Sequence, residues 1–231
     1  MPTATSGVSR PAAVVFDIFG TLFELDPLGA RLESAGLPKQ SLKLWFSRML
    51  RDAFACEAAG TFRNFREVAA GALQVLLVEN GATSDQKQID RVLDGFSELQ
   101  PRKDVENAFR RLQEAKVPIA TLGNGSASTV RQLLERSGLR KYVKHVLSIE
   151  EVKHWKPHRE PYLFAARTFQ VEPNRLALVA AHAWDTHGAH QAGLITGWAS
   201  VLEKRYQAAF DPPDVSGASV DEVVAALVSE H

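Results

Sequence analysis

The sequence predicts a doubly wound α/β core with an inserted helical cap, and three observations support this fold class. Five short, almost uninterrupted apolar runs have the length of strands that are buried on both faces, as in a parallel sheet. Helical patterns separate the later runs, and strand–helix–strand repetition is typical of doubly wound folds. A long helical block follows the first run directly. The five predicted strands cover residues 12–18, 117–122, 145–149, 176–180 and 194–199.

The helical block lies between the first two strands, where apolar residues recur at helical spacing in three segments. Gly60, the Asn80-Gly81 pair and Pro101 separate or end these segments, which cover residues 37–59, 65–78 and 84–99. Further helices are expected over residues 104–116, 126–137, 159–170, 185–193 and 220–229. We therefore expect a core formed by residues 1–23 and 102–231, and a helical cap formed by residues 24–101.

Composition excludes several classes of partner. The 231 residues include 27 Lys and Arg and 27 Asp and Glu, so the formal charge is zero and non-specific nucleic-acid binding is not expected. No apolar run approaches the roughly 20 residues of a membrane span, and the first ten residues lack the apolar stretch of a secretory signal. The single cysteine, Cys56, cannot form an internal disulfide and suits a reducing compartment. We expect a cytoplasmic protein without a membrane or nucleic-acid partner.

Polar side chains follow four of the predicted strands. Asp17 lies at the end of the first run, Asn124 follows the second, Lys156 follows the third, and His182 and Asp185 follow the fourth. Any one of these residues could be a simple turn or helix cap. Because ligands of doubly wound sheets gather at the carboxyl ends of the strands, we expect all of them to converge on one crevice.

Four motifs containing these residues resemble a known family. They are V-F-D-I-F-G-T-L-F at 15–23, L-G-N-G-S at 122–126, W-K-P at 155–157 and A-W-D-T-H-G-A at 183–189. In this order they resemble the haloacid dehalogenase (HAD) superfamily, specifically its type II branch of L-2-haloacid dehalogenases. The resemblance covers nearly the whole chain and implies a modified Rossmann core with a helical cap. It also implies a hydrolase that cleaves the carbon–halogen bond of a small 2-haloalkanoic acid without a cofactor.

The resemblance assigns catalytic roles to five residues. Asp17 would be the nucleophile, forming an ester with substrate that water then hydrolyses. Lys156 would keep Asp17 ionised, since a cation about 4 Å away contributes about 4 kcal/mol at an effective dielectric of about 20. Thr21 and Asn124 would hold the nucleophile and the substrate or leaving group. Asp185 would position Lys156 and the hydrolytic water.

Residues beside these positions, and on the cap, are expected to contact the substrate. They are Ile18, Phe19, Phe46, Phe65, Gly123, Tyr162, His182 and Trp184. Several depart from the pattern of the dehalogenases that the chain resembles: Phe46 stands where those proteins carry an arginine, Gly123 where they carry a serine, and His182 where they carry an asparagine. We therefore expect a shifted substrate preference. His182 is either a proton acceptor at neutral pH or a histidine held only by hydrogen bonds.

Two alternative hydrolases and a binding protein stay open at this point. A HAD-type phosphatase acting on a small phosphorylated metabolite would need a second acid at Phe19 and another at Ala180, and without them a magnesium ion lacks oxygen ligands. A HAD-fold hydrolase could also act on another small carboxylate, or the fold could bind a ligand without catalysis. His182, His187 and His190 match no common zinc signature, so no metal is expected. Proteins that the chain resembles are often homodimers.

Overall fold

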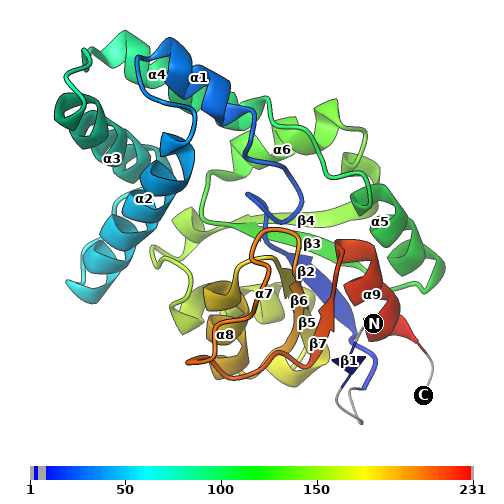
Figure 1. Cartoon of the computed structure of the whole chain (residues 1–231). Helices are drawn as coiled ribbons and strands as arrows, with labels where there is room; N and C mark the ends of the chain where they lie inside the picture. Colours follow the sequence, from blue (N-terminus) through cyan, green and yellow to red (C-terminus); the bar gives the residue numbers. More distant parts are fainter. Residues whose placement is uncertain (1–2, 5–8, 230–231) are drawn as a thin grey trace.

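The computed structural model describes residues 3–4 and 9–229 and shows a sheet flanked by helices, with a further group of helices at one end of it (Figure 1). The sheet order is β1-β7-β6-β5-β2-β3-β4. Strands β2 to β7 run parallel, and β1 pairs antiparallel with β7. The strands are β1 (Thr3–Ala4), β2 (Ala13–Phe16), β3 (Ile119–Gly123), β4 (Val143–Ser148), β5 (Leu176–Ala180), β6 (Ile195–Ala199) and β7 (Val215–Gly217).

Of the nine α-helices of the described residues, five (α1 to α5) follow β2 in succession before β3, and α6, α7 and α8 each separate two later strands. The helices are α1 (Leu28–Ser34), α2 (Ser41–Ala58), α3 (Phe65–Glu79), α4 (Gln86–Asp94), α5 (Val105–Glu114), α6 (Ala127–Arg136), α7 (Arg159–Phe169), α8 (Ala183–Gln191) and α9 (Val220–Val228). Short 3-10 turns occupy Gly95–Ser97, Arg140–Tyr142, Ile149–Glu151 and Pro173–Arg175. The sequence missed α1, β1 and β7, whose two to seven residues are too short to show a periodicity.

Both faces of the sheet are covered, which explains the continuous apolar runs. In β2, Val14 and Phe16 belong to the core shared with α5, α6 and α9, whereas Ala13 and Val15 belong to the core shared with α7 and α8. All four side chains are fully buried. The α/β class predicted from these runs is confirmed, including the parallel pairing of all five predicted strands.

Strand β2 lies between β3 and β5. After β2 the chain adds β3 and β4 on one side of it, and then β5, β6 and β7 on the other side. Such a switch point opens a crevice at the carboxyl ends of the strands. Helices α1 to α4 lie over this end of the sheet (Figure 1). Within that group, the Trp45 indole of α2 donates a hydrogen bond to the Ala69 carbonyl of α3 at 3.0 Å.

None of the helices in the described part of the chain combines the length and the apolarity that crossing a bilayer requires.

Candidate active site

Asp17 directly follows β2, and both oxygens of its carboxylate accept hydrogen bonds. Its backbone N–H donates to the Val179 carbonyl at 3.1 Å, which continues the ladder with β5. Oδ1 accepts a hydrogen bond from Lys156 Nζ at 2.8 Å, and Oδ2 accepts one from Thr21 Oγ1 at 2.6 Å. Gly20, with φ of 85°, forms the turn that brings Thr21 back to Asp17. Thr21 Oγ1 in turn accepts the Ala181 N–H at 2.9 Å.

Lys156 is completely buried and donates all three of its protons. Nζ contacts Asp17 Oδ1 at 2.8 Å, Asp185 Oδ2 at 2.6 Å and the Leu122 carbonyl at 3.0 Å. A buried ammonium group is tolerated only when it is paired and hydrogen-bonded, and both conditions are met here. One cation is thus shared by two carboxylates, which leaves the cluster with an excess of negative charge.

Asp185 lies in the first turn of α8 and is fixed on its other side by a phenol. Tyr162 from α7 donates its O–H to Asp185 Oδ1 at 2.7 Å. Gly188, one helical turn after Asp185, has no room for a β-carbon, which would lie 2.5 Å from the Pro157 Cβ and 2.8 Å from the Tyr162 hydroxyl oxygen. This close approach of α8 to α7 explains the glycine of the A-W-D-T-H-G-A motif.

The shifts of the pKa values in the cluster follow from burial and from the sharing of Lys156 between two carboxylates. Burial alone would raise the pKa of Asp17, but the charges of Lys156 and His182 and the hydrogen bonds from Lys156 and Thr21 lower it below its ordinary 3.8. Burial tends to lower the pKa of Lys156, and the two carboxylates raise it instead. Burial, supported by the charge of Asp17 and opposed by Lys156, raises the pKa of Asp185. Asp17 is therefore the more readily ionised carboxylate.

Asn124, directly after β3, holds the backbone of the lysine. Its Oδ1 accepts the Lys156 N–H at 3.2 Å, while its Nδ2 donates to no oxygen among residues 9–229. Gly123 is buried against Ile18, whose Cγ1 would lie 3.0 Å from an added β-carbon. Ile18 is itself fully buried. The structure therefore places Gly123 and Ile18 beneath the crevice, whereas the amide nitrogen of Asn124 is free to meet a ligand.

His182, after β5, bridges the nucleophile and the cap. Its Nε2 lies 2.9 Å from the Phe19 carbonyl and 3.9 Å from Asp17 Oδ2. A carbonyl oxygen can only accept, so Nε2 carries a proton and acts as a donor in this arrangement. The ring stacks between Phe46 of α2 and Trp184 of α8, with centroids 5.9 and 5.3 Å away.

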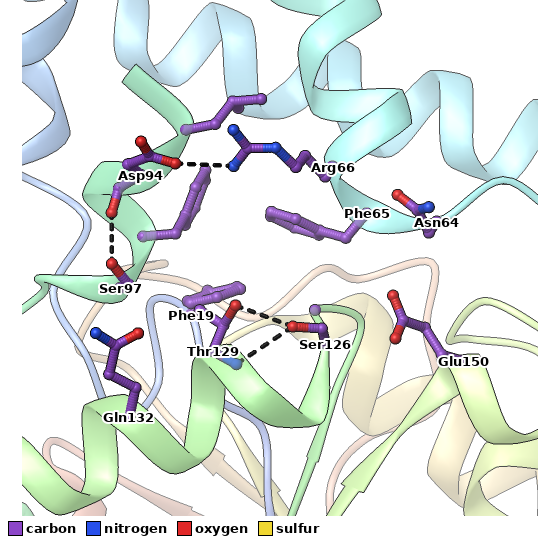
Figure 2. Close-up of a pocket in the computed structure, with 13 residues that line it drawn as sticks. Phe19, Asn64, Phe65, Arg66, Asp94, Ser97, Ser126, Thr129, Gln132 and Glu150 are labelled. Atoms are coloured by element: carbon purple, nitrogen blue, oxygen red, sulfur yellow. Dashed lines mark hydrogen bonds and ion pairs between the residues drawn. The ribbon is translucent and has the colours of Figure 1, made fainter. Parts of the chain in front are cut away.

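Two clefts separate the cap from the core on either side of this bridge. The larger, of about 740 Å³, is mostly apolar and is called the aromatic groove here; Phe46, Phe54, His182 and Trp184 form part of its wall. The smaller, of about 390 Å³, lies between the start of α3, which carries Phe65 and Arg66, and the start of α6, with Phe19 between them (Figure 2). Asp17 lines neither cleft and is 5% exposed, so the cap covers the nucleophile in this arrangement.

A sequence model of the haloacid dehalogenase-like hydrolases matches residues 11–193, and this match includes all four motifs around the cluster. The chain belongs to the haloacid dehalogenase-like hydrolase family. This hydrolase is 28% identical over 200 residues to (S)-2-haloacid dehalogenase H-109 of Pseudomonas putida, covering 86% of this chain and 88% of the relative. It is 27% identical over 218 residues to haloacetate dehalogenase H-2 of Moraxella sp. (strain B), covering 92% and 96%.

Among solved structures, the haloacid dehalogenase-like fold of this chain is similar to that of L-2-haloacid dehalogenase from Xanthobacter autotrophicus. The TM-score is 0.86 with 21% identical residues, over 93% of this chain and 97% of that one. At this level of identity the likeness establishes the fold, which confirms the predicted HAD-like core and cap architecture.

Phe19 occupies the position at which a magnesium phosphatase of this superfamily would carry its second acid. The side chain is 5% exposed and packs against Phe65 and Phe96, with ring centroids 5.2 and 4.8 Å away. Ala180, the position expected for a further acid, is buried in β5. Neither position therefore offers a carboxylate ligand for a magnesium ion beside Asp17 in this hydrolase.

The three histidines near Asp185 do not assemble in the structure. His187 lies 3.5 Å from Asp211 and stacks on Phe210, while His182 faces Asp17. Within the described residues, no group of three metal-binding side chains includes any of these three histidines.

Some residues of this region escaped the sequence reasoning. Leu50 and Phe54 line the aromatic groove with Phe46, and their spacing of four residues along α2 is a signal that could have found them. Leu202 and Phe96 had no such signal, because their places depend on how the cap approaches the core.

Proposed function

We propose that this protein hydrolyses the carbon–halogen bond of small 2-haloalkanoic acids through an ester intermediate on Asp17. The observation that carries the proposal is an ionised, buried Asp17 held by Lys156, with a phenylalanine at the position of the second acid. The printed names of the relatives, (S)-2-haloacid dehalogenase and haloacetate dehalogenase, support the same reaction.

In the first step an oxygen of Asp17 attacks the carbon that bears the halogen, and the halide leaves with the bonding electron pair. Lys156 and Thr21 hold the carboxylate in one orientation, so little entropy is lost when the attack begins. The free Nδ2 of Asn124 is the donor that we assign to the departing halide.

In the second step water attacks the Cγ of the Asp17 ester, and the bond between Cγ and the ester oxygen breaks. The bond between that oxygen and the substrate carbon stays intact, so the oxygen takes one proton of the water and leaves as the hydroxyl group of a 2-hydroxy acid. One proton goes to solvent, and Asp17 regains a carboxylate that contains an oxygen from water. The raised pKa of Asp185 makes it the better proton acceptor of the two acids, and Lys156 links it to Asp17. Burial and the charge of Asp185 raise the pKa of Tyr162 well above its ordinary value, so the phenol stays protonated. Its O–H can therefore donate to Asp185 and hold this carboxylate in place.

For the substrate, we propose binding between the cap and the core, with the aromatic groove beside His182 and Trp184 receiving the organic part of the acid. Phe46 contributes an aromatic face to this groove instead of a cation. Phe65 and Phe19 close the opposite side. Because Asp17 is covered, the cap must open to admit substrate and close to exclude water during ester formation.

The division into domains is a further proposal, with residues 24–101 as the moving cap and residues 1–23 and 102–231 as the core. Its support is that the chain leaves and re-enters the core at one place: Glu24 N–H donates to the Gln100 carbonyl at 3.0 Å, and Arg102 N–H donates to the Leu22 carbonyl at 2.9 Å. We also propose a cytoplasmic location, supported by the single unpaired cysteine, and a homodimer, supported by the exposed Leu44, Val75 and Val78 of the cap.

The test is incubation of the purified protein with 2-haloacids in heavy-oxygen water, followed by halide assay and mass analysis of the peptide that contains Asp17. We expect halide release without added magnesium and heavy oxygen in Asp17 after several turnovers. Label in the product alone would show direct attack by water. Magnesium-dependent release of phosphate from an aryl phosphate, without halide release, would favour the phosphatase instead.

A further inference from the structure

A second cluster of ligand-type side chains lies outside the site described above. Glu57, at the end of the cap helix α2, meets His154 and His158 from the core segment between β4 and α7. Each of the three offers one ligand atom, and these atoms lie within 4.8 Å of one another. Within the described residues this is the one group of three such side chains with this property.

The carboxylate of Glu57 is already turned toward the core. Its Oε1 lies 2.7 Å from His154 Nδ1, and its Oε2 accepts the Trp155 N–H at 2.7 Å. The Glu57 side chain is 18% exposed, so this carboxylate is partly withdrawn from water. A hydrogen bond to one oxygen of a carboxylate fixes its orientation, and the other oxygen can then bind a metal ion. Here the Trp155 N–H fixes Oε2 and leaves Oε1 for this role.

From these contacts we propose that Glu57, His154 and His158 form a binding site for a divalent transition-metal ion of the zinc type. Two imidazoles and a carboxylate, with no thiolate, are a ligand set that zinc accepts, with the fourth position left to water. The ion takes the place of the proton between Glu57 Oε1 and His154 Nδ1, whose 2.7 Å separation needs to widen only slightly. This site goes beyond the proposed dehalogenase function and does not depend on it.

His158 supplies the third ligand by turning its ring. It now stacks on His154, with centroids 4.1 Å apart and planes 12° from parallel, and its Nδ1 accepts the Glu160 N–H at 3.2 Å as the cap of α7. Parallel rings do not aim their nitrogens at one point, so the His158 ring must tilt to bind. It exchanges a long hydrogen bond for a metal–nitrogen bond of about 2.0–2.1 Å.

The position of the site gives the ion a mechanical role. His154 and His158 stand two residues before and two residues after Lys156, and Glu57 belongs to the cap. Trp155 adds a second tie, because its indole N–H donates to the cap carbonyl of Arg63 at 2.8 Å. A bound ion therefore clamps the cap to the segment that carries the buried lysine, and it favours the closed arrangement.

The first test is calorimetric titration of the full chain with ZnCl₂ after treatment with a chelator. We expect one saturable ion per chain, with binding weakened at least about tenfold by Glu57→Gln, His154→Ala or His158→Ala. His187→Ala is the matched control, because His187 also faces a carboxylate, Asp211 at 3.5 Å, yet belongs to no group of three. Absence of saturable binding, or equal affinity in all variants, would overturn the proposal.

The second test asks whether the ion joins cap and core. Hydrogen exchange should slow on zinc addition both at the end of α2 and in residues 153–158 of the unmodified chain and of His187→Ala, but not of Glu57→Gln. Glu57→Gln keeps an oxygen for the Trp155 N–H, so it should fold even if the histidine variants do not. Zinc that binds while leaving either segment unprotected would refute the clamp. Neither readout requires dehalogenase activity, so failure here is separate from failure of the proposed function.

Discussion

The two walls of the crevice between cap and core are built on different principles. On the core side, the charges of Asp17, Lys156 and Asp185 are buried and paired, and each is fixed by at least two hydrogen bonds. On the cap side, the aromatic groove is lined mainly by apolar side chains such as Phe46 and Phe54, and the charged side chains of Lys43 and Arg51 also line it. Removing one member of a buried charge cluster is costly, whereas an apolar wall tolerates exchange of similar residues. The comparison indicates that the core fixes the chemistry and the cap tunes the substrate.

The largest effect is expected from Asp17→Asn. Without its nucleophile the protein should lose at least about 10⁴-fold in kcat for halide release. Stability should fall less than in Lys156→Met, because Lys156 still pairs with Asp185 and no buried charge is left without a partner. Halide assays and urea unfolding measure the two quantities. Retained turnover would contradict the assignment of Asp17 as the nucleophile.

Lys156→Met sharpens the comparison, because it should damage both activity and stability. The substitution leaves Asp17 and Asp185 buried without their shared cation, and breaking such a pair costs about 3–5 kcal/mol of unfolding free energy. We expect kcat to fall about 10²–10³-fold, since the stabilising charge beside the nucleophile is lost. Urea unfolding of Lys156→Met beside Asp17→Asn gives the test: equal stability of the two variants would contradict a lysine shared by two acids.

The same contrast explains what the sequence could predict. The core strands were predictable because strands covered on both faces are apolar at every position, as Val14, Val15 and Phe16 show. Asp17, Lys156 and Asp185 were predictable because few residue types can occupy a buried, paired position. By contrast, only Val215 is fully buried among the three residues of β7, so the sequence of this segment shows no strand pattern. Its pairing with β6 identifies it as a strand.

The cap side was less readable for a physical reason. Phe46 and Phe54 share a helix face, but the partner of that face is set by how the cap lies on the core, and this is not encoded in helical spacing. Glu57 is an ordinary acid near a helix end in the sequence, and only the fold brings it to His154 and Trp155. Nothing in the sequence decided between the two roles considered for His182, whereas its contact with the Phe19 carbonyl makes Nε2 a donor.

Phe46→Ala tests the cap wall. The variant loses the stacking of Phe46 on His182, and aromatic contacts of this kind contribute about 0.5–1.5 kcal/mol. We expect KM for 2-haloacids to rise about two- to tenfold while kcat stays nearly constant. Gln74→Ala, at an exposed position of α3 away from the groove, is the control and should leave both constants unchanged. A large fall in kcat with constant KM would show that the cap wall takes part in the chemistry.

The smallest effect concerns the pH profile, where His182 joins the two walls. The groups facing Asp17 are Lys156, His182 and, through the lysine, Asp185. Because the pKa of Asp17 is lowered, the nucleophile stays ionised below the pH at which an ordinary aspartate is protonated, and kcat/KM should persist on the acid side until pH falls through that lowered pKa. His182→Asn removes a charge that contributes to the lowering, so the acid limb should move to higher pH. His187→Asn, whose ring faces Asp211 instead, should leave the limb in place. A limb that moves to lower pH in His182→Asn would mean that His182 does not stabilise the ionised nucleophile, and the two walls would then act independently.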